Sequence, residues 1–298
     1  MKDPLNIGIK GSGTAFVTPF TDDGKVDVES CQRVMNDSLE AGINFMCVLG
    51  TTSEVPTLSP AEQQQVRDIA VKVNKGRRPI LLGYGGNCTA DIIERMRHDS
   101  FEGIDALLII TPYYNKPSQE GLYQHFRALA EASPRPIVLY NVPGRTGVNM
   151  TAETTLRLAR DCHNIIGIKE ASGKMDQVQE IIKKRPEGFR VLSGDDKFSC
   201  EIMEMGGDGV ISVVANAWPA ETAAMTKAAL SGDVKKAEQI DKHMKPIYAP
   251  LFAEGNPSGV KAALSLKGRC KNNLRLPLVP VSDKLMHEIK TVITDDGL

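Results

Sequence analysis

The 298-residue sequence lacks any run of about 18 apolar residues, the length that a helix needs to span a bilayer. Its first segment, "MKDPLNIGIKGSGTAFVTPF", also lacks the apolar core and small-residue cleavage site of a signal peptide. An excess of charge of one sign is missing too: the net charge of -1 gives neither a basic surface for nucleic acid nor a polybasic patch for a membrane. These absences predict a cytoplasmic protein whose partners are small molecules or other subunits.

Paired disulfide and metal ligands are missing as well. The 6 cysteines contain no C-x-x-C pair, which argues against a disulfide framework and favours buried free thiols. The 5 histidines form no H-x-E-type or i,i+4 pair, so we expect no metal site. No G-x-G-x-x-G fingerprint occurs, and the glycines of "GIKGSGTAF" and "GYGGN" are interpreted as turns. Metal and nucleotide chemistry are therefore not expected.

The sequence does contain eight short apolar runs that alternate with helix-like segments. The runs are "TAFVT", "FMCVLG", "PILLG", "ALLIIT", "PIVLY", "IIGIK", "RVLSG" and "GVISV". A capping box at Ser59 and Glu62 predicts the start of one intervening helix, and Thr89 and Ser118 are expected to cap two others. Apolar strands that alternate with helices indicate a parallel sheet covered on both faces. Eight repeats of this unit predict a closed (β/α)8 TIM barrel.

The chain is expected to divide into a barrel over residues 1–230 and a helical C-terminal region over residues 231–298. The second part contains "DVKKAEQIDKHM" and "NPSGVKAALSLKG", which suit extra helices. No linker rich in Gly, Pro or Ser separates the two parts. We therefore expect the C-terminal helices to pack on the barrel and share its core.

In a barrel of this kind the chemistry lies at the carboxyl ends of the strands. Those ends are unusually polar here: they read "GTTSE" (50–54), "TPYYN" (111–115), "YNVPGRTG" (140–147), "KE" (169–170) and "SGDD" (193–196). Because parallel strands end at the same rim, the side chains of these segments are expected to meet there. The rim is the predicted active site.

Lys169 closes an apolar strand, where a lone lysine ordinarily reaches solvent or an ion-pair partner. Strand alternation would place Lys169 and Gly167 on the inner face and Ile166 and Ile168 against the helices. A lysine amine held in the barrel mouth is a nucleophile that condenses with a keto acid to form a Schiff base. Tyr140 ends the adjacent strand and could pass protons during imine formation.

Further hydroxyls and one guanidinium are expected at the same rim. Thr51 or Thr52, with Tyr113 or Tyr114, could relay a proton, although each also suits an ordinary turn or packing position. Arg145 lies in a loop rich in glycine and proline, and its planar fork suits a carboxylate. Their meeting at one rim favours a catalytic site over separate structural roles.

The segments "GTTSE", "TPYYNKPSQEGLYQHF", "LYNVPGRTG", "NIIGIKEASG", "LSGDD" and "GGDGVISV", in this order and spacing, closely resemble the dihydrodipicolinate synthase (4-hydroxy-tetrahydrodipicolinate synthase) family over nearly the whole chain. The resemblance implies a TIM barrel with C-terminal helices, usually a homotetramer built as a dimer of dimers. It also implies a lyase that condenses pyruvate with L-aspartate 4-semialdehyde in lysine biosynthesis through diaminopimelate. No cofactor is implied, because pyruvate binds as a covalent imine.

The resemblance implies a role for each matching position. Lys169 would form the Schiff base with pyruvate, and Tyr140 would be the central acid/base. Thr51 would link Tyr140 to Tyr114, which would reach into the active site of the neighbouring subunit. Thr52 would help to hold the carboxylate of pyruvate, and Arg145 would guide the carboxylate of the semialdehyde. The backbones of Gly194 and Ile211 would line the site.

One residue departs from the family pattern. Ser53 stands where the family usually has glycine, and a serine there would be strained if the position required a positive φ. A separate question is feedback inhibition by lysine, because Asn87 and Tyr113 match positions of the inhibitor pocket in regulated members. Four other positions do not resemble that pocket, which favours low sensitivity to lysine: Val55, Pro56, Pro60 and Gln63.

Two other functions remain open from the sequence. Sialic acid lyases and keto-sugar-acid aldolases share the scaffold and the lysine, but they typically carry Ser-Thr at the position of Thr51 and Thr52 and lack a match to Arg145. A non-catalytic pyruvate-binding sensor would keep the fold, and retention of the hydroxyl groups and the arginine argues against it. Turnover assays would separate these alternatives.

Overall fold

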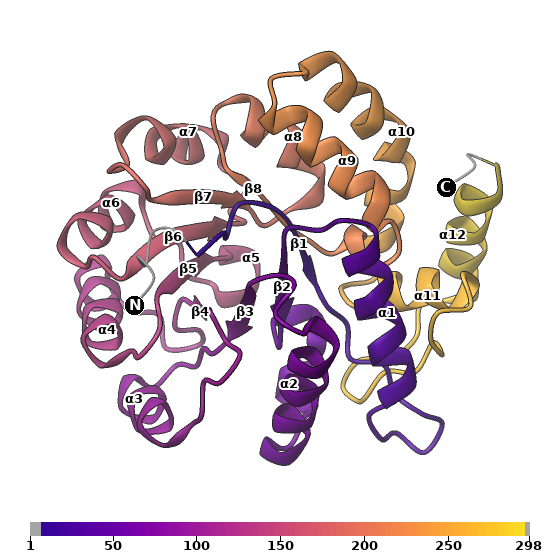
Figure 1. Ribbon diagram of the computed structural model, residues 1–298, viewed down its shortest axis with the longest axis horizontal. Coiled ribbons are helices and arrows are strands. Elements are labelled where there is room, and N and C mark those ends of the chain that lie inside the picture. The colour runs from indigo at the N-terminus through magenta and orange to yellow at the C-terminus, as the bar shows by residue number, and fades with distance from the viewer. Residues whose placement is uncertain (1–6, 296–298) are drawn as a thin grey trace.

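A closed barrel of eight parallel strands forms the centre of the computed structural model, which describes residues 7–295 (Figure 1). Each strand pairs with the next along the chain, and the eighth pairs back to the first. This arrangement confirms the predicted TIM barrel. The strands are β1 (Gly11–Ala15), β2 (Phe45–Val48), β3 (Ile80–Gly83), β4 (Ala106–Ile110), β5 (Ile137–Asn141), β6 (Ile165–Glu170), β7 (Arg190–Ser193) and β8 (Gly209–Ser212).

Helices surround the strands, and Figure 1 shows them as an outer ring. Three helices follow the last barrel unit, and α12 packs against α10 and α11. The division of the chain near residue 231 stays a prediction. The helices are α1 (Val28–Glu40), α2 (Pro60–Asn74), α3 (Thr89–His98), α4 (Gln119–Ala132), α5 (Pro143–Thr146), α6 (Ala152–Asp161), α7 (Met175–Lys184), α8 (Ser199–Glu204), α9 (Pro219–Leu230), α10 (Val234–Phe252), α11 (Ser258–Leu266) and α12 (Asp283–Asp295).

The helix starts follow local chemistry in two of the three predicted cases. Ser59 and Glu62 form the predicted capping box of α2, and Ser118 accepts a hydrogen bond from the Gly121 amide at the start of α4. Thr89 was expected to cap α3 but lies inside it, one residue after the N-cap. The Thr89 hydroxyl instead lies 2.8 Å from Nδ1 of His125, so a contact between helices replaces the local cap.

Strand β1 lies three residues earlier than its apolar run suggested, because Gly11 and Gly13 belong to the strand rather than to turns. A Cβ added at Gly13 would lie 2.1 Å from the Phe45 ring. Phe45 is fully buried in the barrel interior and occupies the space that the glycine leaves. Apolar periodicity cannot detect such a strand, since its contribution to packing is the lack of a side chain.

Two apolar layers lie on the two sides of the barrel wall. Phe45, Val138 and Leu192 belong to the interior layer, whereas Ile168 belongs to the layer between strands and helices. Ile166 was expected against the helices but packs inside the barrel. The pairing of β5 with β6 skips Ile166, and this irregularity interrupts the simple alternation on which the expectation rested.

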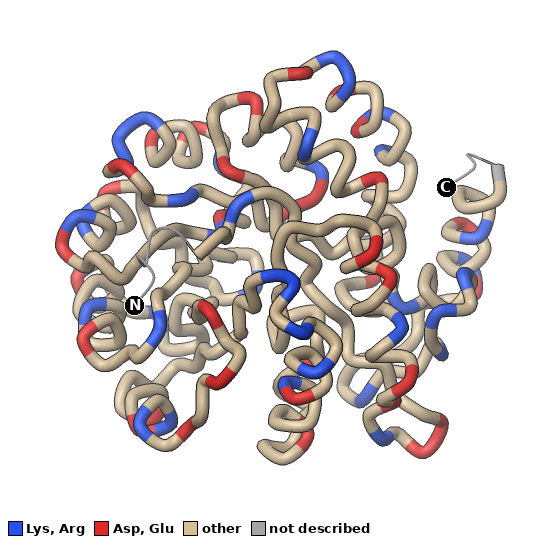
Figure 2. The backbone as a smooth tube through the Cα atoms, in the orientation of Figure 1, with Lys and Arg blue, Asp and Glu red and all other residues tan. Residues whose placement is uncertain are grey.

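The surface carries both signs of charge in an interspersed pattern, as Figure 2 shows for the outer helices. None of the helices in the described residues is long and apolar enough to cross a membrane. All six cysteines are free, five of them buried and Cys88 exposed. The predicted free thiols are therefore confirmed, with Cys88 as the exception to their burial.

Candidate active site

Lys169 points into the barrel from the end of β6. It lies in register with Tyr140 on β5 and with Leu192 on β7, and both of these residues belong to the interior layer. Side chains in register on adjacent parallel strands share a face, so the predicted inward direction of Lys169 is confirmed. Its Nζ atom lies 4.3 Å from the centroid of the Tyr140 ring, and the residue is only 5% exposed.

Small and neutral groups surround this amine. A Cβ added at Gly194 would lie 3.0 Å from Cε of Lys169, so the glycine lets the end of β7 approach the lysine closely. Burial raises the pKa of the nearby Cys47 thiol to about 11, which leaves it uncharged at neutral pH. Ile211 is 1% exposed in the same interior layer. Cys47 therefore provides no thiolate that could compete with the Lys169 amine at neutral pH.

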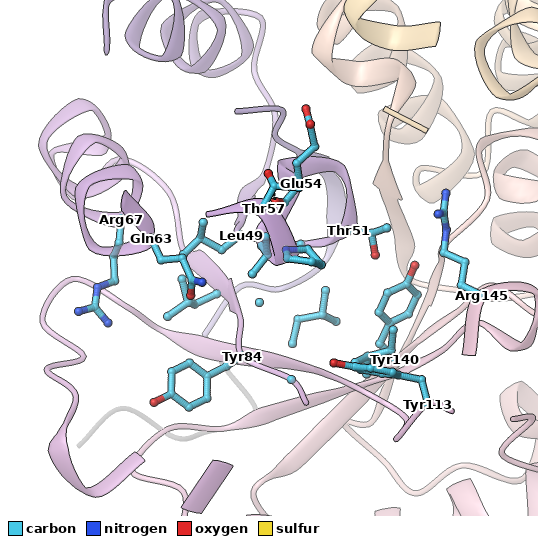
Figure 3. A pocket seen from close by; sticks show the side chains of 18 of the residues that line it. Leu49, Thr51, Glu54, Thr57, Gln63, Arg67, Tyr84, Tyr113, Tyr140 and Arg145 are labelled. Carbon is cyan, nitrogen blue, oxygen red and sulfur yellow. Dashed lines mark hydrogen bonds between the residues drawn. The ribbon is translucent and has the colours of Figure 1, made fainter. Parts of the chain in front are cut away.

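A cavity of about 770 Å³ opens above this layer. Thr51, Tyr113, Tyr140 and Arg145 line it, and Figure 3 shows them gathered at one end. The opposite end is lined by residues of α2 and of the segment after β3, among them Arg67. Six other predicted residues do not line the cavity, although the structure describes them: Thr52, Asn87, Tyr114, Lys169, Gly194 and Ile211.

Thr52 lies in the short 3-10 helix Thr51–Ser53 that follows β2, and its side chain contacts a distant part of the chain. The residue is 2% exposed, and its Oγ1 accepts a hydrogen bond of 3.0 Å from Nδ2 of Asn256. Asn256 lies between α10 and α11 and itself lines the cavity. No sequence motif predicts the role of Asn256, because Asn256 and Thr52 are 204 positions apart and nothing local links them.

Backbone strain in the loop after β2 falls on Leu49 and Glu54 rather than on Ser53. Leu49 and Glu54 each have a φ of 56°, whereas Ser53 is not among the residues with positive φ. The Ser53 hydroxyl donates a hydrogen bond of 2.6 Å to the Phe16 carbonyl, so serine fits where glycine is usual. Glu54 forms an ion pair with Lys261 of α11, and both side chains are fully buried. Burial lowers the pKa of Lys261, and the Glu54 carboxylate opposes that shift.

The loop that carries Arg145 is fixed on both sides by Asn141. The Asn141 amide donates to the Glu170 carboxylate at 3.0 Å, and its oxygen accepts a hydrogen bond of 2.9 Å from the Met150 amide. Burial raises the pKa of Glu170, which points away from the barrel interior on the residue after Lys169. One network therefore connects the end of β6 with the loop of Arg145.

Tyr114 does not join the other predicted residues within this chain. It is 85% exposed and has a φ of 73°, whereas the adjacent Tyr113 is 41% exposed and lines the cavity. The two side chains thus have different surroundings. Asn87 donates a hydrogen bond of 3.3 Å to the Tyr113 carbonyl, so the two residues matched to an inhibitor pocket do lie together.

Comparisons with known proteins agree on one family. A model of the dihydrodipicolinate synthetase family matches residues 8–296. The chain is 49% identical to the 4-hydroxy-tetrahydrodipicolinate synthase of Phocaeicola vulgatus over 96% of this chain and 97% of that protein.

Solved structures give the same result. The solved structure of a monomeric dihydrodipicolinate synthase variant is 40% identical in sequence to this chain, and the two superpose with a TM-score of 0.95 over 99% of each chain. The Acinetobacter baumannii dihydrodipicolinate synthase complexed with pyruvate is 40% identical, with a TM-score of 0.94 over 97% of this chain and 99% of that chain.

Proposed function

The chain belongs to the dihydrodipicolinate synthetase family, and we propose that its reaction proceeds through an imine between Lys169 and pyruvate. Its activity is the one for which the relatives are named, the 4-hydroxy-tetrahydrodipicolinate synthase step of lysine biosynthesis. The observation that supports Lys169 is its buried amine, 4.3 Å from the Tyr140 ring beside the cavity. The substrates are pyruvate and L-aspartate 4-semialdehyde.

In the first step the Lys169 amine attacks the keto carbon of pyruvate. A carbon–nitrogen bond forms, the former keto oxygen leaves as water, and the imine remains. The two protons of the amine pass to the departing oxygen through the Tyr140 hydroxyl, and Thr51 at the same end of the cavity takes part in this relay. The Thr52 hydroxyl and the backbones of Gly194 and Ile211 hold the pyruvate.

In the second step one methyl proton moves to the imine nitrogen, which converts the imine into an enamine. The enamine carbon attacks the aldehyde carbon of the semialdehyde and forms the new carbon–carbon bond. The amino group of this substrate then displaces Lys169 from the imine carbon, which closes the ring and frees the enzyme. Arg145 is exposed at the cavity mouth, where it can hold the carboxylate of the incoming substrate.

The assembly that we propose is a homotetramer in the cytoplasm, built as a dimer of dimers. Support comes from Tyr114, whose ring is 85% exposed and therefore free to enter a neighbouring subunit's site. We also propose low sensitivity to lysine, because Val55, Pro56 and Gln63, which line the same cavity as Tyr113, carry no acidic or imidazole group. A titration of the activity with lysine measures that sensitivity.

The function is tested by supplying pyruvate with L-aspartate 4-semialdehyde and, separately, N-acetylneuraminate alone. We expect the first pair to be consumed with formation of the cyclic product, and the second compound to stay intact. Cleavage of N-acetylneuraminate would make the chain a sialic acid lyase. Trapping of pyruvate without release of any product would instead make it a sensor.

A further inference from the structure

The C-terminal region reaches the candidate active site through Asn256. This residue follows α10, outside the barrel strands, yet it lines the cavity together with Thr51, Tyr140 and Arg145. Its contact within the site is the hydrogen bond of 3.0 Å from Nδ2 to Oγ1 of Thr52. A residue from outside the barrel therefore controls the surroundings of one barrel hydroxyl.

We propose that Asn256 is a positioning residue that fixes Thr52 as a hydrogen-bond donor to the carboxylate of pyruvate. A threonine hydroxyl has one proton and two acceptor lone pairs. The Asn256 amide occupies an acceptor side of Thr52, so the single hydroxyl proton remains available for another acceptor. A carboxylate can only accept hydrogen bonds, and it is therefore the partner that this arrangement selects.

The contact is well isolated from the rest of the structure. Asn256 is 8% exposed, and its Oδ1 has no hydrogen-bond partner among the described residues. Replacement of the side chain thus removes the hydrogen bond to Thr52. It breaks no hydrogen bond of the amide oxygen, because that atom has none within the described part of the chain. The backbone nearby is held independently, because the Ser258 hydroxyl donates a hydrogen bond of 2.9 Å to the Val279 carbonyl.

The inference rests on the proposed role of Thr52, and the measurement is chosen to separate the two. The readout is the pyruvate concentration that half-saturates the borohydride-trapped adduct, followed by mass spectrometry without the second substrate. Absence of the adduct in the unmodified protein would reject the proposed function itself. If the unmodified protein forms the adduct and the Asn256 variants have the same half-saturating pyruvate concentration as it does, only the role of Asn256 is rejected.

Two substitutions at position 256 have different expected effects. Asn256→Ala removes one hydrogen bond and should raise the half-saturating pyruvate concentration about tenfold. Asn256→Asp is nearly isosteric but can only accept from Thr52, and it adds a negative charge near the bound carboxylate. We expect it to raise that concentration about 100-fold or more, which is a larger effect than the alanine variant produces.

Matched controls distinguish positioning from a loss of structure. Ser258→Ala removes a neighbouring hydrogen bond of the same segment and should leave pyruvate saturation unchanged. In a Thr52→Val background, Asn256→Ala should add little, because the two residues act through one bond. If Asn256→Ala fails to fold, the isosteric Asn256→Asp carries the test. The proposal would be overturned if Asn256→Asp had the half-saturating pyruvate concentration of the unmodified protein. Additive effects of Thr52→Val and Asn256→Ala in the double variant would overturn it as well.

Discussion

Arg145 combines exposure with a fixed supporting loop, which suits a residue that captures a charged substrate from solvent. Arg145→Ala should raise the KM for L-aspartate 4-semialdehyde about 10- to 100-fold, since a charge-assisted pair is lost. Trapping of pyruvate should continue. The control is Arg160→Ala, because Arg160 is also exposed but lies on α6. Equal loss of pyruvate trapping in Arg145→Ala would identify a structural arginine that supports the Tyr140 loop.

His125 gives a pH dependence that is independent of catalysis. Burial between α3 and α4 lowers its pKa to about 4, so the folded state holds the neutral ring. Its contribution to stability is complete above the ordinary pKa of about 6.5 and is lost as the pH falls towards about 4. Across that window the unmodified protein should lose about 3 kcal/mol more stability than His125→Gln.

The measurement for His125 is the urea midpoint of both proteins at several pH values between neutrality and the onset of acid unfolding. His243 is an exposed histidine, and His243→Gln should follow the unmodified protein. Parallel curves for His125→Gln and the unmodified protein would show that the His125 ring becomes protonated without cost inside the fold.

At the scale of the elements, α11 is attached to the loop after β2 by the buried ion pair of Lys261 and Glu54. Lys261→Met should lower the free energy of unfolding by about 3 to 5 kcal/mol, because it leaves the Glu54 carboxylate buried without its ion-pair partner. Adding Glu54→Gln to Lys261→Met should restore much of that loss, since no charge then remains to be desolvated. A double variant as unstable as Lys261→Met would contradict this explanation. Denaturant unfolding measures all three proteins.

The sequence allowed prediction of the elements wherever the signal was local. Apolar runs identified β2 through β8, and Ser59 with Glu62 marked the start of α2. Strand β1 was misplaced because Gly13 packs by lacking a side chain, and Ile166 was turned the wrong way by an irregular strand pairing. Both exceptions depend on partners far along the chain.

The candidate site shows the same division. The residues at the ends of successive strands were predictable, because a barrel brings all of those ends to one rim. Asn256 and Lys261 were not, since each contacts the loop after β2 across more than 200 residues. Motif spacing carries no record of such contacts, and the three-dimensional structure was needed to find them.

At the scale of the whole molecule, Tyr114 predicts a site shared between subunits. Tyr114→Phe should lower activity by about 10² to 10⁴, the usual contribution of a positioned acid or base. Tyr113→Phe, the matched change next to it, should have a smaller effect. A structural tyrosine on the surface would tolerate loss of its hydroxyl.

Subunit exchange tests the sharing directly. Tyr114→Phe subunits mixed with Lys169→Ala subunits should form interfaces in which one site has Lys169 from the first and Tyr114 from the second. That site should be active, although both parent proteins are not. Verified hybrids that remain as inactive as their parents would show that Tyr114 serves its own subunit.

Covalent trapping tests directly whether Lys169 forms the imine with pyruvate. Incubation with pyruvate and borohydride should add one reduced three-carbon group, located by peptide mapping in the segment "GIKEASG". Lys169→Ala should carry no adduct, whereas Lys174→Arg, a change at a nearby exposed lysine, should carry it in full. An adduct on any other lysine, or one that persists in Lys169→Ala, would contradict the account.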